Sequence, residues 1–254
     1  MGKPTPRPAD AYDAWAPVYD RTFGALVAGA RRRAIGQLDL RPGQRVLDLG
    51  VGTGAAMNAV PPDVGVLGVD LSQSMLDRAA RRLNRQQGDA ARHLVRADAQ
   101  LPPFADHTFD HVILTHVVSV VDDPAAVMRR VARLVRPTGS VLIVNHFREP
   151  DSPLSGVKKL INPMCMRIGW RSDLTLVDCL KDADLSVERV EKRSPFDLWR
   201  AVHLKPTAKP APSPGLGSDH APSLTAPPDA FADPAQANPE VNAAIKPSLA
   251  MYIR

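Results

Sequence analysis

Short apolar runs alternate with amphipathic segments between residues 44 and 204. Runs such as VLDL, GVLGV, HVILT and SVLIV have the length and the β-branched content of buried strands. Between the runs, apolar side chains recur at helical spacing, as Val127, Val131 and Leu134 do. Strands that alternate with helices in this way predict βαβ units. We therefore expect an α/β fold with a doubly wound, mostly parallel sheet and helices on both faces.

The pattern predicts seven strands, five of them alternating with helices and two closing the sheet. The strands are expected at residues 44–50, 65–72, 91–99, 109–118, 139–147, 185–194 and 196–204. Ser72 is placed to cap a helix over residues 73–86, and Pro124 to begin another over residues 123–137. A further helix is expected over residues 175–184.

Four regions of different character follow from the same pattern. Residues 1–40 read as N-terminal helices that cover the active site, and residues 41–204 as the catalytic core. An insertion at about residues 148–172 is too long for a simple connection and suggests a lid. Residues 205–254 are rich in Pro and Ala without an apolar period, so a disordered tail is expected there.

The charge and the cysteines narrow the choice of partners. A net charge of +5 favours an anionic partner, but no zinc finger or RNA-binding motif is present, so no nucleic-acid partner is expected. Cys165 and Cys179 are isolated, which predicts no metal site and a reducing compartment. The N-terminus lacks the apolar core of a signal peptide, so a cytoplasmic location is expected. The sequence does not specify an oligomeric state.

Three glycines close the first strand, in VLDLGVGTG at residues 46–54. Gly50, Gly52 and Gly54 indicate a tight turn that brings the backbone close to a ligand. Gly50, Gly52 and Ala55 also satisfy the loose dinucleotide fingerprint, so the glycines alone fit a nicotinamide dinucleotide or another adenosine ligand.

Acidic residues near the ends of three strands favour S-adenosylmethionine over a dinucleotide. Asp48 precedes the glycines and could accept a hydrogen bond from a cationic amino group, which NAD lacks at that point. Asp70 suits a ribose diol, and Asp98 could accept from an adenine amino group. Each acid alone is also an ordinary turn or cap residue, but three at successive strand ends form a pattern.

Together VLDLGVGTG, GVDLSQSML, RADAQLPPFADHTFD and LVRPTGSVLIV resemble the class I S-adenosylmethionine-dependent methyltransferases, whose fold is Rossmann-like, over about residues 10–203. The resemblance implies that the glycine loop holds the methionine part, Asp70 the ribose, and Asp98 with Ala99 the adenine. Thr138 departs from the family, which often has glycine there. The remaining expected cofactor-binding residues are Leu71, Met75 and Thr115.

YDAWAPVYDRTFG, THVVSVVDDP, LIVNHF and RIGWRSD more closely resemble the bacterial phosphatidylethanolamine N-methyltransferases, which make phosphatidylcholine by successive methylations. Aromatic faces favour quaternary ammonium groups. Tyr12 and Trp15 are therefore expected to bind substrate together with Trp170, and Tyr19 to line the catalytic pocket, although Trp15 could equally anchor a helix on the sheet.

His116 and His146 follow the fourth and fifth strands, at the edge where such sheets bind ligands. Either could take the amine proton, directly or through water, or hold the lipid phosphate. These roles stay open at this point, beside the alternative that each histidine is a hydrogen-bonded structural residue.

The insertion GVKKLINPMCMRIGWR combines four basic residues with bulky apolar ones and no acid, as interfacial segments do. We therefore expect peripheral association with an anionic membrane on its cytoplasmic face. The alternative is a lid that packs on its own domain. Arg31, Arg32 and Arg33 read mainly as a solvated helix face. Rival functions are C-methylation of a prenylated quinone precursor, methylation of another small molecule, and non-catalytic cofactor binding; NAD-dependent oxidation is disfavoured because no Tyr-x-x-x-Lys pair is present.

Overall fold

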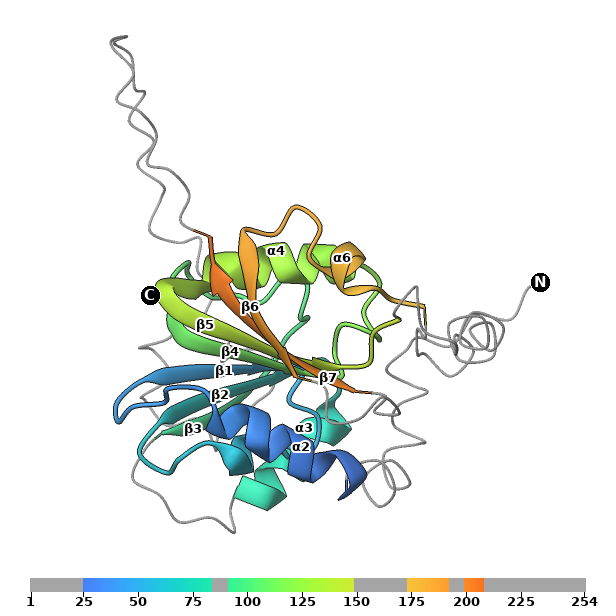
Figure 1. The fold of residues 1–254 in the computed structure, drawn as a ribbon. Helices are drawn as coiled ribbons and strands as arrows, with labels where there is room; N and C mark the ends of the chain where they lie inside the picture. The colour runs from blue at the N-terminus through green and yellow to red at the C-terminus, as the bar shows by residue number, and fades with distance from the viewer. Residues whose placement is uncertain (1–24, 84–90, 149–172, 192–198, 208–254) are drawn as a thin grey trace, which may run out of the picture.

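The computed structural model of the protein describes residues 25–83, 91–148, 173–191 and 199–207. These residues form one seven-stranded sheet with α2 and α3 on one face and α4 and α6 on the other (Figure 1). The elements in chain order are α2 (Ala25–Gly36), β1 (Arg45–Leu49), the 3-10 turn η2 (Met57–Ala59), β2 (Gly65–Asp70), α3 (Gln73–Leu83), β3 (Arg92–Arg96), β4 (Phe109–Thr115), α4 (Pro124–Leu134), β5 (Val135–Asn145), α6 (Leu176–Cys179), β6 (Leu185–Glu191) and β7 (Arg200–Pro206).

The strands lie in the order β3-β2-β1-β4-β5-β7-β6, which confirms the predicted doubly wound sheet. β1 to β5 are mutually parallel, whereas β7 runs antiparallel to both β5 and β6. The order reverses between β1 and β4, and open sheets bind ligands beyond the carboxyl ends of the strands at such a point. The loops after β1 and β4 therefore define the candidate site.

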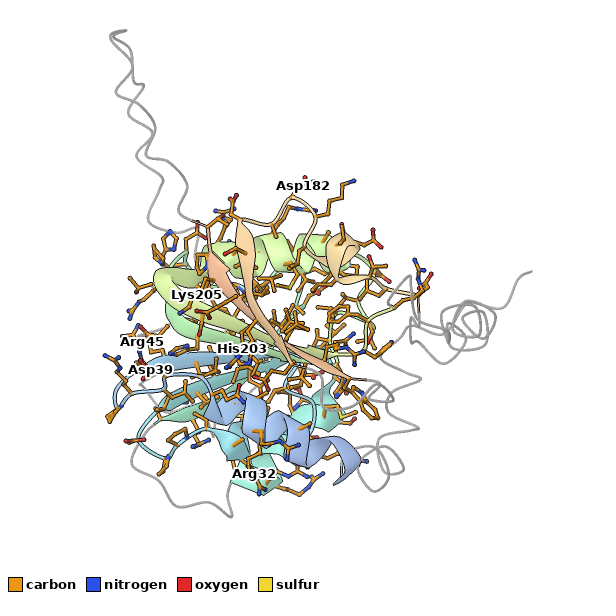
Figure 2. All side chains as sticks on the ribbon, viewed as in Figure 1. Arg32, Asp39, Arg45, Asp182, His203 and Lys205 are labelled. Atoms are coloured by element: carbon orange, nitrogen blue, oxygen red, sulfur yellow. The ribbon has the colours of Figure 1, made fainter. Side chains whose placement is uncertain are left out.

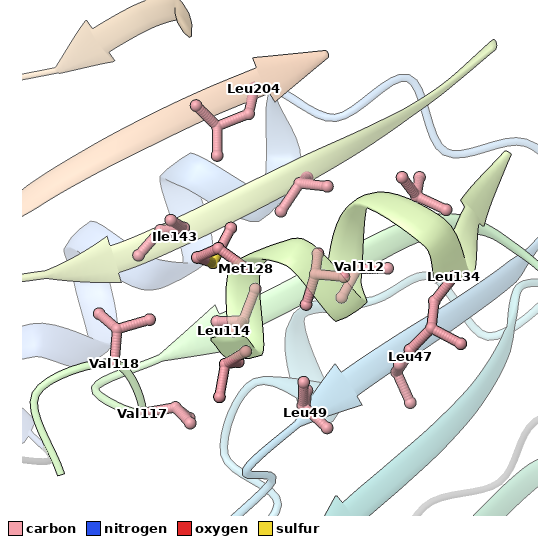
Figure 3. Packing of buried hydrophobic residues seen from close by; sticks show 14 of the residues in the cluster. Leu47, Leu49, Val112, Leu114, Val117, Val118, Met128, Leu134, Ile143 and Leu204 are labelled. Carbon is pink, nitrogen blue, oxygen red and sulfur yellow. The ribbon is translucent and has the colours of Figure 1, made fainter. Parts of the chain in front are cut away.

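Two apolar clusters fix the helices on the sheet. The first lies on the α4 face, where Leu114 and Ile143 from the sheet pack with Met128 and Leu134 (Figure 3). The second lies on the α2 face and contains Ile35 of α2. Successive strand residues alternate between the two clusters, so strand parity tells which face a side chain occupies.

The capping signals act as predicted. The Ser72 hydroxyl accepts a hydrogen bond from the amide of Met75 at 3.3 Å, at the start of α3. Asp123 caps α4 by accepting from the amide of Ala126 at 2.9 Å, and Pro124 is the first helical residue. Both helices begin where local chemistry satisfies their first amides.

Some element boundaries differ from the sequence-based prediction. The helix expected over residues 123–137 ends at Leu134, and β5 begins at once with Val135, so Pro137 and Thr138 belong to the strand. α6 is a single turn, Leu176–Cys179, where a ten-residue helix was expected. β7 begins at Arg200 and extends to Pro206.

α2 (Ala25–Gly36) is the part of the predicted N-terminal helices that lies within the described residues. It packs on the sheet face against β5 and β7, and Ala34 and Ile35 are buried there. Residues 1–24, the predicted lid at 148–172 beyond residue 148, and the predicted tail beyond residue 207 lie outside the described residues. No helix among the described residues is both long and apolar enough to cross a bilayer.

Candidate active site

The bend after β1 requires glycine for two reasons, one of backbone conformation and one of space. Gly50, Gly52 and Gly54 have φ angles of 73°, 53° and 76°, a region that L side chains rarely adopt. A Cβ on Gly50 would also lie 2.2 Å from Cγ2 of Val117, in the loop after β4. The glycines therefore permit both the turn and the close approach of two loops at the switch point.

Asp70 links the glycine bend to the next strand. Its Oδ2 accepts a hydrogen bond from the amide of Gly52 at 2.8 Å, and its Oδ1 accepts from the amide of Ser72 at 2.9 Å. A carboxylate oxygen can accept more than one hydrogen bond, as binding of a ribose hydroxyl beside the Gly52 amide would require. Asp70, which is expected to bind the ribose, thus also holds the glycine loop, which is expected to contact the same ligand.

α3 supports the bend from its outer side. A Cβ on Gly54 would lie 3.1 Å from Cβ of Ala79, so the loop rests directly on this helix. Arg82 donates from one guanidinium nitrogen to the carbonyl of Thr53 at 2.9 Å and to its hydroxyl at 3.0 Å. These contacts fix the loop before any ligand is bound.

Asp48 is a buried carboxylate, and neither of its oxygens has a hydrogen-bond partner among the described residues. Burial raises its pKa to about 7; the charge of Arg31 opposes this and that of Asp70 adds to it. An unpartnered buried acceptor is costly, so the arrangement favours a ligand that brings donors. The ammonium of a bound amino acid moiety matches this requirement.

His116 combines backbone strain with an unpartnered ring nitrogen. Its φ is 62°, and its amide donates to the carbonyl of Val144 at 2.9 Å, which holds the conformation. Nε2 is fully enclosed and has no hydrogen-bond partner in the part of the chain that the structure describes. Burial lowers the pKa of His116 to about 3, with further lowering from His146 and Arg31. The imidazole is therefore neutral at physiological pH.

His146 follows the last residue of β5 and is buried. Its electrostatic effect on His116 shows that the two imidazoles lie near each other, as expected from their positions at neighbouring strand ends. Thr115 ends β4 beside them and is half-buried.

The remaining expected cofactor residues gather at the same edge. The amide of Ala97 donates to the carbonyl of Asp70 at 3.1 Å, which brings the segment after β3 beside that strand end. Asp98 accepts from the amide of Gln100 at 2.8 Å in a local turn, as the structural alternative anticipated, and Ala99 packs on the core. Leu71 is 51% exposed, whereas Met75 is buried at the start of α3.

The expected substrate-side aromatic residues, Tyr12, Trp15, Tyr19 and Trp170, lie outside the described residues, so their predicted roles stay predictions.

Two residues at this edge were missed by the sequence analysis. Arg31 is half-buried and acts electrostatically on Asp48 and His116, whereas its neighbour Arg32 is exposed on the outer side of α2 (Figure 2). Arg31 lies four residues before buried Ile35, so helical spacing could have placed it on the inner face. Trp199 precedes β7 and meets the ring of His116 edge to face, with centroids 6.4 Å apart.

The opposite edge of the sheet has satisfied polar groups. His111 is bonded through Nδ1 to the Ser140 hydroxyl at 2.6 Å and through Nε2 to Oε1 of Gln44 at 3.1 Å. The amide of Arg45 donates to Asp110 at 2.9 Å. Figure 2 shows Arg45 and Asp39 at this end, where β1 begins. The contrast with Asp48 and His116 marks the carboxyl edge as the ligand edge.

The geometry also decides between the two cofactor classes. A dinucleotide site places the pyrophosphate at the N-terminus of a helix that starts directly after the glycine loop. Here the only helical element between β1 and β2 is the three-residue turn η2, in a stretch that is described throughout. In place of an anion-binding helix N-terminus, this loop lies beside the buried carboxylate of Asp48, which suits a cationic group.

Comparison with known proteins agrees. A family model described as a methyltransferase domain matches residues 47–143. The chain belongs to the class I S-adenosylmethionine-dependent methyltransferases, and S-adenosylmethionine is its cofactor. It is similar to the phosphatidylethanolamine N-methyltransferase of Cereibacter sphaeroides, with 36% identity over 195 residues, 77% of this chain and 95% of that protein.

Other similarities are more distant. The demethylmenaquinone methyltransferase of Lactobacillus johnsonii is 28% identical over 64% of this chain and 65% of that protein. The structure of a geranyl diphosphate methyltransferase in complex with SAM superposes with a TM-score of 0.61 at 15% identity, over 71% of this chain and 85% of that one. The latter likeness concerns the fold.

Proposed function

We propose that the protein methylates the ethanolamine nitrogen of phosphatidylethanolamine and of its partly methylated forms, toward phosphatidylcholine. The likeness to the Cereibacter sphaeroides enzyme supports this substrate class, because it extends over 95% of that protein. The carboxyl edge of the sheet supports the chemistry.

One observation supports the amine chemistry: Nε2 of the neutral His116 ring is enclosed and has no partner within the described ranges. An amine attacks a methyl group only through its unprotonated lone pair, and methyl transfer depends mainly on the orientation of that lone pair. In the first two methylations the unprotonated nitrogen still carries an N–H, which Nε2 would accept and so aim the lone pair. The dimethylated nitrogen has no N–H, so other contacts would orient it in the third methylation. Because its pKa is near 3, His116 is a poor base for the proton that the amine releases. His146 or water would then accept this proton.

The cofactor supplies an electrophilic methyl group on a sulfonium centre. Asp48 and the bend at Gly50 and Gly52 would hold its amino acid part, and Asp70 its ribose hydroxyls. Leu71 offers an exposed apolar surface beside Asp70 for the adenine ring. Asp98 would accept a hydrogen bond from the adenine amino group. Thr115 is proposed to line the same site.

The proposal extends to the residues outside the described part. Tyr12, Trp15 and Trp170 would bind the acceptor, Tyr19 would line the methyl-transfer pocket, and the basic apolar lid would contact an anionic membrane. On this view the protein acts in the cytoplasm at the inner membrane face.

A second candidate is C-methylation of a prenylated quinone precursor. The likeness to demethylmenaquinone methyltransferase favours it, and the cofactor site would be shared. Such a substrate would need a base for a ring carbon and no cation-binding wall.

The deciding experiment incubates the purified full chain with methyl-labelled S-adenosylmethionine and a panel of acceptors. The panel contains phosphatidylethanolamine, its monomethyl and dimethyl forms, and a demethylated prenyl quinone. We expect label in the ethanolamine headgroups, and label in the quinone alone would overturn the proposal.

A further inference from the structure

The reversed direction of β7 brings a tryptophan to the active-site edge. β5 and β7 pair antiparallel, with Val144 opposite Ala201 and Asn145 opposite Arg200. One further step on each strand places Trp199 opposite His146. The same strand end receives His116, whose amide bonds to Val144. Trp199 therefore stands beside both active-site histidines, although it lies far from them in the sequence.

Strand parity places these side chains on one side of the sheet. Ala201 and Val144 pack in the cluster beneath α2, and Trp199 and His146 lie two residues from them. Asp48 has the same parity as Val46 of that cluster. Trp199 thus shares the α2 side of the carboxyl edge with the unpartnered carboxylate of Asp48.

The contact between Trp199 and His116 has a defined geometry. The ring planes meet at 85°, so they stand edge to face. A neutral imidazole adds no positive charge to this corner, and an indole face attracts a cation through its quadrupole. The pair forms a corner in which one wall accepts an N–H and the other is aromatic.

Resting on the proposed function, we propose that Trp199 is a specificity-determining residue whose indole binds the methylated ammonium of the acceptor headgroup. A primary ammonium is strongly hydrated and seeks hydrogen-bond acceptors. Each added methyl removes one N–H, which weakens hydration and leaves an apolar cation suited to an aromatic wall. Trp199 would therefore lower KM for the partly methylated acceptors, which bind as ammonium ions and lose a proton before they react, relative to the unmethylated one.

The test compares wild type with Trp199→Leu and the matched aromatic variant Trp199→Phe. KM is measured for phosphatidylethanolamine and for its dimethyl form in the same vesicles. We expect Trp199→Leu to raise KM for the dimethyl lipid roughly 3- to 30-fold, with a smaller change for the unmethylated lipid and partial retention in Trp199→Phe. Equal KM changes for both lipids, or none, would overturn the proposal.

Two further measurements separate this inference from its premises. Unchanged affinity for S-adenosylhomocysteine shows that Trp199→Leu is folded. If Trp199→Leu unfolds, Trp199→Phe alone decides, by the ratio of its KM for the dimethyl lipid to its KM for the unmethylated lipid. Binding of choline and of its uncharged isostere 3,3-dimethyl-1-butanol to the S-adenosylhomocysteine complex tests the cation site directly. Wild type should prefer choline and Trp199→Leu should not. If wild type methylates no ethanolamine lipid yet shows this preference, the proposed function fails while the cation site stands.

Discussion

The Asp70 carboxylate and the Gly52 amide are joined by a 2.8 Å hydrogen bond, so the second strand holds the loop that follows the first. Because of this bond, Asp70, which is expected to bind the ribose, also positions the glycine bend. Loss of Asp70 should therefore affect the cofactor site through two contacts at once.

Asp70→Asn should weaken binding of S-adenosylhomocysteine roughly 10- to 100-fold, because an amide replaces the charged acceptor of the Gly52 bond. Isothermal titration calorimetry gives the affinity. Asp77→Asn is the matched control, since Asp77 is an exposed acid on α3. Equal affinities of the two variants would show that Asp70 has no special role.

Gly50→Ala should destabilise the fold by about 2–4 kcal/mol and abolish cofactor binding, because it adds a Cβ that meets Val117 to an unfavourable backbone conformation. Gly43→Ala separates these causes. Gly43 has a φ of 79° but nothing within 4 Å of the added Cβ, so only the backbone term of about 1–2 kcal/mol is expected. Chemical denaturation measures both, and equal losses would remove the Val117 contact from the explanation.

Asp48 should make stability depend on pH in a defined direction. Burial raises its pKa from 3.8 to about 7 in the folded state. The folded protein therefore binds this proton more tightly, and the resulting stability is complete below about pH 4 and lost as the pH rises to about 7. The free energy of unfolding of wild type relative to Asp48→Asn should fall by about 4 kcal/mol over this range.

Other buried groups shift the other way, and the comparison of two variants removes them. The pKa of His116 is lowered, so its contribution is lost as the pH falls. Both proteins retain His116, and only Asp48 differs between them. Parallel stability curves would mean that Asp48 has a partner.

His146→Ala should lower turnover while the affinity for S-adenosylhomocysteine stays near that of wild type. His146 adjoins the proposed amine site, whereas the cofactor contacts come from the loops after β1 and β2. His111→Ala is not a matched control for activity, because His111 bonds to Gln44 and Ser140 in the fold. Unchanged turnover would exclude a role for His146, and a pH–rate profile would show whether it takes the proton.

The protein should co-sediment with vesicles that contain anionic phospholipid and dissociate at high salt. Basic residues of the proposed lid, Lys158, Lys159, Arg167 and Arg171, provide the reason. Replacing all four by Gln should abolish the dependence on lipid charge. Binding that is indifferent to that charge would contradict the electrostatic contribution.

The sequence predicted the sheet well because the strands are buried runs between clear turn signals. It also placed Asp48, Asp70 and the two histidines at one edge, since parallel strands bring their carboxyl ends together. Helix ends were less predictable. Pro137 disfavours helix at Arg136, but the end of α4 at Leu134 also depends on the pairing of β5 from Val135 onward, which is a tertiary effect. The length of α6 was mispredicted in the same way, because its sequence has no clear signal for where the helix ends.

Trp199 and Arg31 were missed for different reasons. Arg31 lies beside two other arginines, and only its distance from Ile35 distinguishes it. Trp199 reaches the site because β7 runs backwards between β5 and β6, and the direction of a strand is not visible in its own residues.

The position of β7 also bears on synthesis of the protein. Among the strands of the described residues, β7 comes last in the chain, so the outer edge of β5 has no neighbour until about residue 206 has emerged from the ribosome. Nascent chains and C-terminal truncations that end before this point would expose an unpaired edge prone to aggregation. Transient shielding by a chaperone would then matter most in the interval between the emergence of β5 and that of β7.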